Sequence, residues 1–168
     1  FLWEGQLNLL KLGEGGMTRA SATIIPTRTS ALQVSVSSTI PLQTLFSVRA
    51  VNPFTGGLVW QDQFDGDAHA GDYPYDLVFD RNNAVVVCGQ TGSASSGPMF
   101  LALKYANTGN RQWVRTYDSP DPIDISLRVG IDGSQNVYVS GYSEPSSGIQ
   151  ASITTIKYSP VGDTLWIK

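Results

Sequence analysis

The sequence repeats one short element. It reads KYANTGNRQW from Lys104 to Trp113 and KYSPVGDTLW from Lys157 to Trp166. A third copy, NPFTGGLVW, runs from Asn52 to Trp60. Its tryptophans follow one another at intervals of 53 residues, and so do the glycines four positions before them. The residues that keep this spacing are Trp60, Trp113 and Trp166, and Gly56, Gly109 and Gly162. Self-similarity at a fixed period indicates a repeat architecture.

A longer match lies upstream of the two later copies. YDLVFDRNNAVVVCGQT (75–91) aligns with LRVGIDGSQNVYVSGYS (127–143) at an offset of 52, which pairs Asp80 with Asp132 and Gly89 with Gly141. An eroded copy of the same pattern precedes Trp60. The chain is therefore predicted to form a single domain, 1–168, of three units: a divergent one at about 4–60, then about 61–113 and about 114–166.

Each unit predicts four short strands and no helix. The first strand ends in an Asp before a Gly/Asn turn, which is ordinary turn chemistry. The second alternates, so that Val85 and Val87 face one way and Val86 and Cys88 the other. The third is MFLALKY or ASITTIKY, and the fourth follows the glycine and carries the tryptophan. Pro and Gly punctuate the chain throughout. The prediction is an all-β protein.

A four-stranded unit of about 53 residues is typical of a β-propeller blade. The alternatives are a β-sandwich and a β-solenoid, but a sandwich does not repeat a tryptophan at fixed spacing and solenoid rungs are shorter. We expect a glycine turn to lead into the outer strand of each blade, where the indole covers the gap to the next blade. Tyr105 and Tyr158 recur beside Lys104 and Lys157, and recurrence favours a structural role: the tyrosines pack between blades while the lysine stems cover apolar surface.

The later units resemble a bacterial family of β-propeller repeats. Its blades read approximately Asp-x-x-Gly-Asn-Val-Tyr-Val-Thr-Gly, followed by Lys-Tyr, Gly and Trp. The matching residues are Asp132, Asn136, Val137, Tyr138, Val139, Gly141, Lys157, Tyr158, Gly162 and Trp166, and in the preceding unit Asp80, Val85, Val87, Gly89, Lys104, Tyr105, Gly109 and Trp113. The resemblance covers about residues 46–168, and residues 1–45 depart from it. It implies a secreted or surface-exposed protein, found beside adhesion modules and without assigned catalysis.

The segment VRAVNPFTGGLVWQ (48–61) carries a weaker resemblance, to the tryptophan-docking repeats of quinoprotein propellers. Ala50, Thr55, Gly56 and Trp60 match that pattern, whereas Asn52 replaces its Asp. Both patterns have one physical cause, the packing of blades, so neither indicates a cofactor. No quinone is predicted.

Three units are fewer than the four to eight blades of a propeller. Open sheet edges and apolar faces at the ends of such an arc need capping, a partner or self-association. We therefore expect a homo-oligomer or homopolymer that completes the blades between chains. The alternative is that this is a piece of a longer propeller.

Composition narrows the function classes. Charged residues make up only 15% of the chain, against about a quarter usually, and Lys and Arg form no cluster. Nucleic acid is therefore not an expected partner. Cys88 is the only cysteine, which leaves no internal disulfide. No apolar run is long enough for a transmembrane helix. The chain starts at Phe1 instead of Met, which fits a mature secreted protein or a fragment.

The sequence contains only weak indications of a catalytic or metal site. His69 is the only histidine, and nothing in the spacing brings it to Cys88, so we predict no enzyme. Asp65, Asp67 and Asp72 crowd one Gly-containing connection and are calcium candidates, because that ion prefers carboxylate oxygens. The alternative is that they are ordinary turn residues, since no Glu stands where a twelve-residue calcium loop requires one.

The sequence favours a non-catalytic extracellular structural or assembly module. One alternative is a propeller that binds a glycan or a cell-surface protein, since exposed Tyr and Trp side chains stack on sugars. A second is a propeller enzyme of quinoprotein or polysaccharide-active type.

Overall fold

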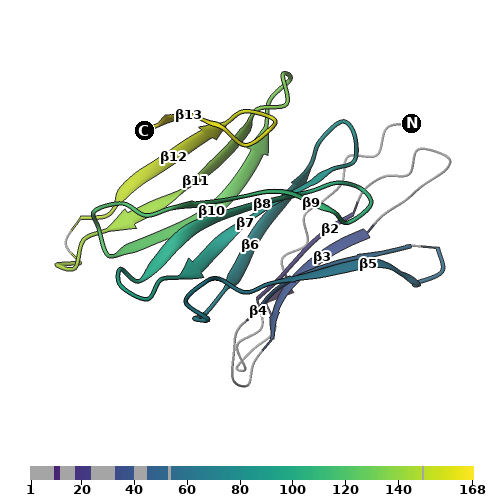
Figure 1. The fold of residues 1–168 in the computed structure, drawn as a ribbon, viewed down its shortest axis with the longest axis horizontal. Helices are drawn as coiled ribbons and strands as arrows, with labels where there is room; N and C mark the ends of the chain where they lie inside the picture. The colour runs from purple at the N-terminus through teal and green to yellow at the C-terminus, as the bar shows by residue number, and fades with distance from the viewer. Residues whose placement is uncertain (1–9, 12–17, 24–32, 40–44, 53, 149) are drawn as a thin grey trace.

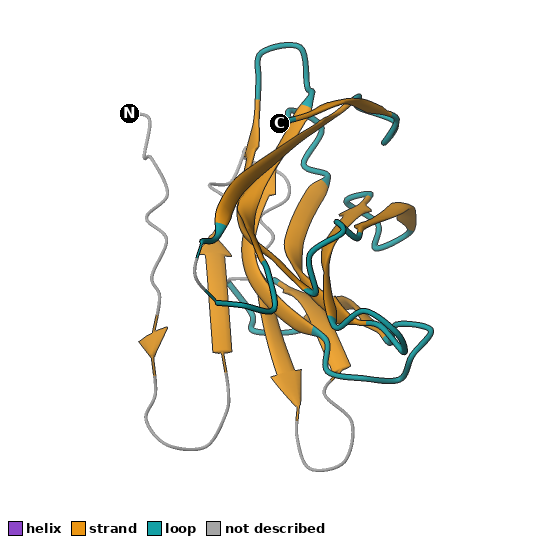
Figure 2. Cartoon of the chain, turned by 90° about the vertical axis from the view of Figure 1, so that its left-hand side faces the viewer, coloured by secondary structure: helices purple, strands orange, loops and turns teal. Residues whose placement is uncertain are grey.

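The computed structural model describes residues 10–11, 18–23, 33–39, 45–52, 54–148 and 150–168. Within these ranges the protein is all-β, as predicted, and Figure 2 shows strands and loops without a helix in the described part of the chain. The described residues include no helix long and apolar enough to cross a bilayer. Trp3, which the sequence places at the end of a preceding unit, lies outside the described residues.

The strands form three antiparallel sheets, each built in chain order. The N-terminal sheet contains β1 (Leu10–Lys11), β2 (Thr18–Thr23), β3 (Gln33–Thr39), β4 (Leu45–Val51) and β5 (Leu58–Phe64). The middle sheet contains β6 (Tyr73–Phe79), β7 (Val85–Gly92), β8 (Pro98–Tyr105) and β9 (Arg111–Tyr117). The C-terminal sheet contains β10 (Ile123–Ile131), β11 (Val137–Glu144), β12 (Ser152–Tyr158) and β13 (Thr164–Ile167). Figure 1 shows the middle sheet between the other two.

Two hydrophobic clusters join the sheets face to face. The first lies between the N-terminal and middle sheets and includes Phe46, Val85 and Tyr105. The second lies between the middle and C-terminal sheets and includes Cys88 and Ile156. The middle sheet is thus covered on both faces, which explains the uninterrupted run VVVC in β7, whose four side chains are fully buried.

An aspartate builds the first turn of the two later sheets. Asp80 directly follows β6, and its Oδ1 accepts backbone N–H groups from Asn82 and Ala84 at 2.8 and 2.9 Å. Asp132 directly follows β10, and its Oδ1 accepts the N–H groups of Ser134 and Asn136 at 2.9 and 2.8 Å. A carboxylate that satisfies two turn donors fixes both hairpins in the same way.

The last two strands of all three sheets share one irregularity. The ladder shifts register between Ala50 and Val51, between Lys104 and Tyr105, and at the Lys157–Tyr158 step. Such a bulge bends the strand and increases its twist. In each sheet the bulge lies directly before a glycine turn, and in the middle and C-terminal sheets that turn receives a tryptophan.

Candidate functional site

Trp60 crosses from the N-terminal sheet to the middle sheet. Its Nε1 donates a hydrogen bond to the carbonyl of Asn107 at 3.0 Å, and its ring stacks on Tyr105 with 5.7 Å between centroids. Gly109 lies in the same turn with φ of 91°. A Cβ placed on Gly109 would come within 2.7 Å of Trp60 Cγ. The turn therefore needs glycine both for its backbone conformation and for the space that the indole occupies.

Trp113 makes the same contact one sheet later. Its Nε1 donates to the carbonyl of Pro160 at 3.3 Å, and its ring lies 6.0 Å from that of Tyr158. Gly162 has φ of 92°, and a Cβ there would be 2.9 Å from Trp113 Cγ. Trp113 is 7% exposed. Each contact joins a tryptophan of one sheet to the glycine turn of the next, and we call this arrangement tryptophan docking.

Trp166 occupies the same position in the C-terminal sheet but has no docking turn among the described residues. Its ring meets Tyr138 of its own sheet, 5.9 Å away and edge-on. The surrounding face is open: Ile153 is 81% exposed, whereas Phe100, its counterpart in the middle sheet, is 1% exposed. The face of the middle sheet that carries Phe100 is therefore covered by the next sheet, whereas the described residues leave the equivalent face of the C-terminal sheet uncovered.

The glycine turn of the N-terminal sheet likewise has no tryptophan docked on it among the described residues. Gly56 has φ of 69°, and no described residue comes within 4 Å of a Cβ built on it. Phe54, two residues earlier, is 78% exposed. Val51 pairs with Leu58 in the ladder and so stands where Tyr105 and Tyr158 stand in the other sheets. The described chain therefore has one docking tryptophan without a turn and one glycine turn without a tryptophan.

Polar contacts accompany both docked tryptophans. Asp62 Oδ2 accepts hydrogen bonds from the Tyr105 hydroxyl at 2.8 Å and from Arg111 Nε at 3.0 Å. Burial raises the pKa of Tyr105, and Asp62 raises it further, so the phenol stays a neutral donor. In the next sheet Arg115 stands where Asp62 stands, and its Nε donates to the carbonyl of Gly162 at 2.6 Å. The residue two positions after the tryptophan thus contacts the neighbouring sheet both times.

The recurring lysine pairs with the turn aspartate of its own sheet. Lys104 Nζ lies 2.9 Å from Asp80 Oδ2, and the two side chains are 6% and 3% exposed. Burial raises the pKa of Asp80, but the hydrogen bonds from Lys104 and from the turn outweigh it and leave that pKa below its ordinary value. Lys157 Nζ lies 3.6 Å from Asp132 Oδ2 in the C-terminal sheet, with side chains 19% and 30% exposed.

The three calcium candidates have different surroundings. Asp65 Oδ2 lies 2.7 Å from Nδ1 of His69, Asp67 is exposed, and Asp72 is fully buried and accepts the N–H of Gly66 at 3.0 Å. Burial raises the pKa of Asp72. Within the described ranges no group of three or more His, Cys, Asp or Glu side chains is placed to hold a metal ion. Calcium binding stays a prediction.

Asp72 has a counterpart that sequence reasoning did not assign. Asp124 is also fully buried, accepts the N–H of Ser119 at 2.6 Å and accepts the hydroxyl of Ser143 at 2.5 Å. Both carboxylates therefore hold the backbone of the connection that precedes a sheet. The signal was present in the sequence, because Asp72 and Asp124 differ by the offset of 52 that relates the two units.

Cys88 and His69 are in unlike environments. Cys88 is fully buried within the second cluster, and this burial raises the pKa of its thiol. His69 is exposed, and its hydrogen bond to Asp65 raises the pKa of the imidazole. A buried thiol kept protonated is a poor nucleophile.

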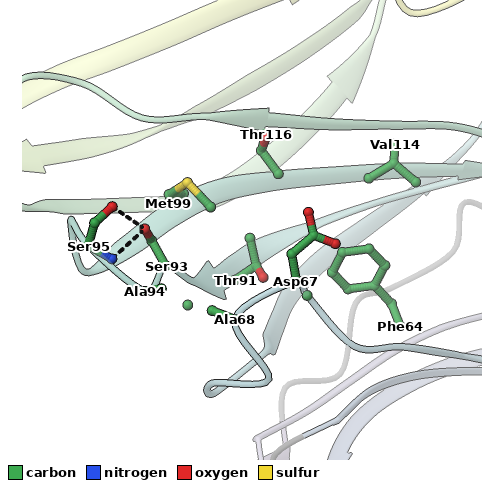
Figure 3. Close-up of a pocket in the computed structure, with 12 residues that line it drawn as sticks. Phe64, Asp67, Ala68, Thr91, Ser93, Ala94, Ser95, Met99, Val114 and Thr116 are labelled. Atoms are coloured by element: carbon green, nitrogen blue, oxygen red, sulfur yellow. Dashed lines mark hydrogen bonds between the residues drawn. The ribbon is translucent and has the colours of Figure 1, made fainter.

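A pocket of about 460 Å³ lies between the end of β5 and the middle sheet. Phe64, Met99 and Val114 give it an apolar part, while Asp67 and several hydroxyl groups give it hydrogen-bonding groups. Figure 3 shows Met99, Val114 and Thr116 on one side of the pocket and Asp67, Ala68 and Phe64 on the other. Its lining residues include no Lys, Arg or His. This chemistry suits a small ligand that is neutral or cationic.

Comparison with protein-family models and with curated proteins gave no match for this chain.

Gly109→Ala is expected to destabilise the protein more than Gly56→Ala. Both substitutions put a side chain on a residue with positive φ, which costs roughly 1–2 kcal/mol. Only the methyl group at Gly109 also displaces a docked indole, and such overpacking adds about 1–3 kcal/mol. Urea unfolding of both variants in a Trp166→Ala background measures the difference without a contribution from association. Equal losses would show that Trp60 does not rest on this turn.

Proposed function

We propose that this chain is a non-catalytic structural module of β-propeller-type blades, acting in an extracellular setting, that self-associates through the open faces at the ends of its stack of sheets. Trp166 carries the proposal. Two identical positions, Trp60 and Trp113, are covered by the glycine turn of a following sheet, and the described residues offer Trp166 no such turn. The occupant with the right chemistry is a sheet of this same kind from a second copy of the chain.

The open face of the C-terminal sheet has the composition of a reversible interface. Ile153, Tyr138 and Trp166 supply apolar and aromatic surface. Ser140 and Thr155 lie between them, with 2.9 Å between their hydroxyl oxygens. The corresponding covered face of the middle sheet is fully apolar at these two positions. A face that mixes aromatic anchors with hydroxyl groups is typical of non-obligate association.

Repetition supports a structural role. The side chains with the most distinctive contacts, the docking tryptophans and the Lys–Asp pairs, occur in equivalent positions of different sheets. One active site needs its residues once, whereas packing needs them in every copy. The low charge content and the abundance of small polar residues support an extracellular setting.

Sedimentation velocity of the wild type and of Trp166→Ala tests the proposal. The wild type is expected to sediment as an assembly, and Trp166→Ala as a single folded chain, because the truncated side chain removes the aromatic centre of the interface. Ile167→Ala is the matched control: Ile167 is 43% exposed and adjacent to Trp166, but it pairs with Ile156 in the ladder and shares the face that packs against the middle sheet. A wild type that sediments as a single chain would overturn self-association.

The pocket beside Phe64 favours a second candidate function, the binding of a small neutral carbohydrate. Its apolar part can pack against the C–H face of a sugar, and its carboxylate and hydroxyl groups can bind sugar hydroxyls. Saturation-transfer NMR with a panel of methyl glycosides is expected to give signals that Ala94→Trp, which fills the pocket, abolishes. Ala151→Trp, exposed and outside the pocket, is the control. Unchanged signals in Ala94→Trp, or none in the wild type, would reject this candidate.

A further inference from the structure

The geometry points to a head-to-tail contact in which Trp166 of one copy docks on the Asn52–Gly57 turn of a second copy. This inference rests on the proposed function, and it adds the identity of the receiving surface and the direction of the assembly. The two tryptophan dockings inside the chain serve as its template.

The template places each hydrogen-bonding partner. In both internal dockings, the indole N–H donates to the carbonyl two residues before the positive-φ glycine: Asn107 before Gly109, and Pro160 before Gly162. The residue two positions before Gly56 is Phe54. This turn is one residue longer than the template turns, since the Gly56 N–H bonds to the carbonyl four residues back instead of three. Counted back from the glycine, the Phe54 carbonyl is the one assigned to the indole N–H of Trp166 from another copy.

The residue two positions after the tryptophan extends the match. Arg115, two positions after Trp113, donates to the carbonyl of Gly162. Lys168 stands two positions after Trp166 and is exposed. On the same template its ammonium group donates to the carbonyl of Gly56 in the second copy.

The receiving face is compatible in polarity. By the ladder register, Ser47 and Arg49 of β4 stand where the middle sheet has Leu101 and Leu103, which face the N-terminal sheet. The face that would receive the C-terminal sheet is therefore more polar than the internal one. Val51, in place of a tyrosine, offers Trp166 a smaller apolar contact. Polar groups would thus meet the hydroxyl-bearing face of the C-terminal sheet, and the contact is expected to be weaker than either internal docking.

A two-fold pairing of C-terminal sheets fits less well. It would bring two lysines of this face, Lys157 and Lys168, toward the same two lysines of the partner, whereas the head-to-tail contact brings them toward Arg49 alone. Like charges across an interface are unfavourable, so the two-fold pairing carries the larger repulsion. It would also leave the glycine turn of the N-terminal sheet open. Head-to-tail contacts either close into a ring or grow into a filament. Two copies of three sheets give six, which is within the range of closed propellers.

A mixing experiment tests the direction of the contact. Trp166→Ala removes the donor but keeps the turn, whereas Val51→Lys keeps Trp166 but puts a positive charge on the receiving face, where Lys168 would arrive. Each variant is expected to stay a single chain by light scattering. An equimolar mixture is expected to form a complex of two chains that grows no further, because each variant supplies the half that the other lacks. Gly56→Val is a second turn variant, and circular dichroism verifies that every variant folds.

The outcomes separate the two proposals. If Val51→Lys and Gly56→Val still assemble while Trp166→Ala does not, self-association stands and the assignment of the turn is wrong. A mixture that stays monomeric, while the wild type assembles, also overturns the head-to-tail contact. If the wild type does not assemble, the proposed function itself fails. Ile167→Ala is the control and is expected to assemble like the wild type, because Ile167 shares the face of Ile156 and not that of Trp166.

Discussion

Replacing Trp113 with alanine is expected to lower the free energy of unfolding by about 3–5 kcal/mol, as for other large-to-small substitutions of buried aromatic residues. The indole is 7% exposed, packs beside Tyr158 and belongs to the cluster that joins the middle and C-terminal sheets. Its loss leaves a cavity between two sheets and removes the hydrogen bond to Pro160. Urea unfolding followed by circular dichroism measures the effect.

Trp166→Ala is the matched control for this prediction. Both substitutions remove a tryptophan from the equivalent position of a last strand. The side chain of Trp166, however, is only half-buried, and no sheet among the described residues covers it. At concentrations where the protein is monomeric, we expect a clearly smaller loss of stability than for Trp113→Ala. Similar losses would mean that the docking contact of Trp113 contributes little to stability.

Lys104→Met is expected to cost a comparable amount, about 3–5 kcal/mol, because it leaves a buried carboxylate without its partner. Methionine keeps most of the apolar stem of the side chain and removes the charge. The remaining Asp80 is 3% exposed, so its charge is poorly solvated in the folded protein. Chemical denaturation at neutral pH measures the loss.

Two further variants isolate the charge effect. Lys157→Met removes the equivalent pair in the C-terminal sheet, where both partners are more exposed, and a much smaller change is expected. Adding Asp80→Asn to Lys104→Met is expected to restore part of the stability, because the amide oxygen can still accept the turn N–H groups without a charge. A Lys104→Met variant no less stable than Lys157→Met would contradict the account.

The repeat made much of the fold readable from the sequence. The all-β character and four-stranded antiparallel sheets were predicted from strand alternation and turn residues. The structure confirms the all-β character and the four strands of the middle and C-terminal sheets, whereas the N-terminal sheet has five. The Asp before each first turn was recognisable because turn chemistry is local. The environment of each copy in the folded protein could not be recognised from the sequence. Lys104–Asp80 and Lys157–Asp132 are the same sequence feature, yet the first is deeply buried and the second is not. The described residues cover the middle sheet on both faces but leave the Lys157 face of the C-terminal sheet uncovered.

The carboxylate cluster shows a different limit. Asp65, Asp67 and Asp72 are close in sequence, and the sequence does not say which way a loop turns each side chain. In the structure Asp72 points inward and holds the backbone of Gly66, while Asp65 and Asp67 face solvent. Open faces at the two ends were expected, because three units are fewer than a propeller needs. The degree to which each tryptophan is covered could not be predicted, because it depends on neighbouring sheets that local sequence does not describe.

The mass of the wild-type chain in solution, measured by light scattering over a dilution series, tests the central claim most directly. The account predicts a mass that is a multiple of the single-chain mass at high concentration and that falls toward it on dilution, since the interface is reversible. A single-chain mass at every concentration, from a protein with the β-sheet spectrum of the folded state, would contradict it.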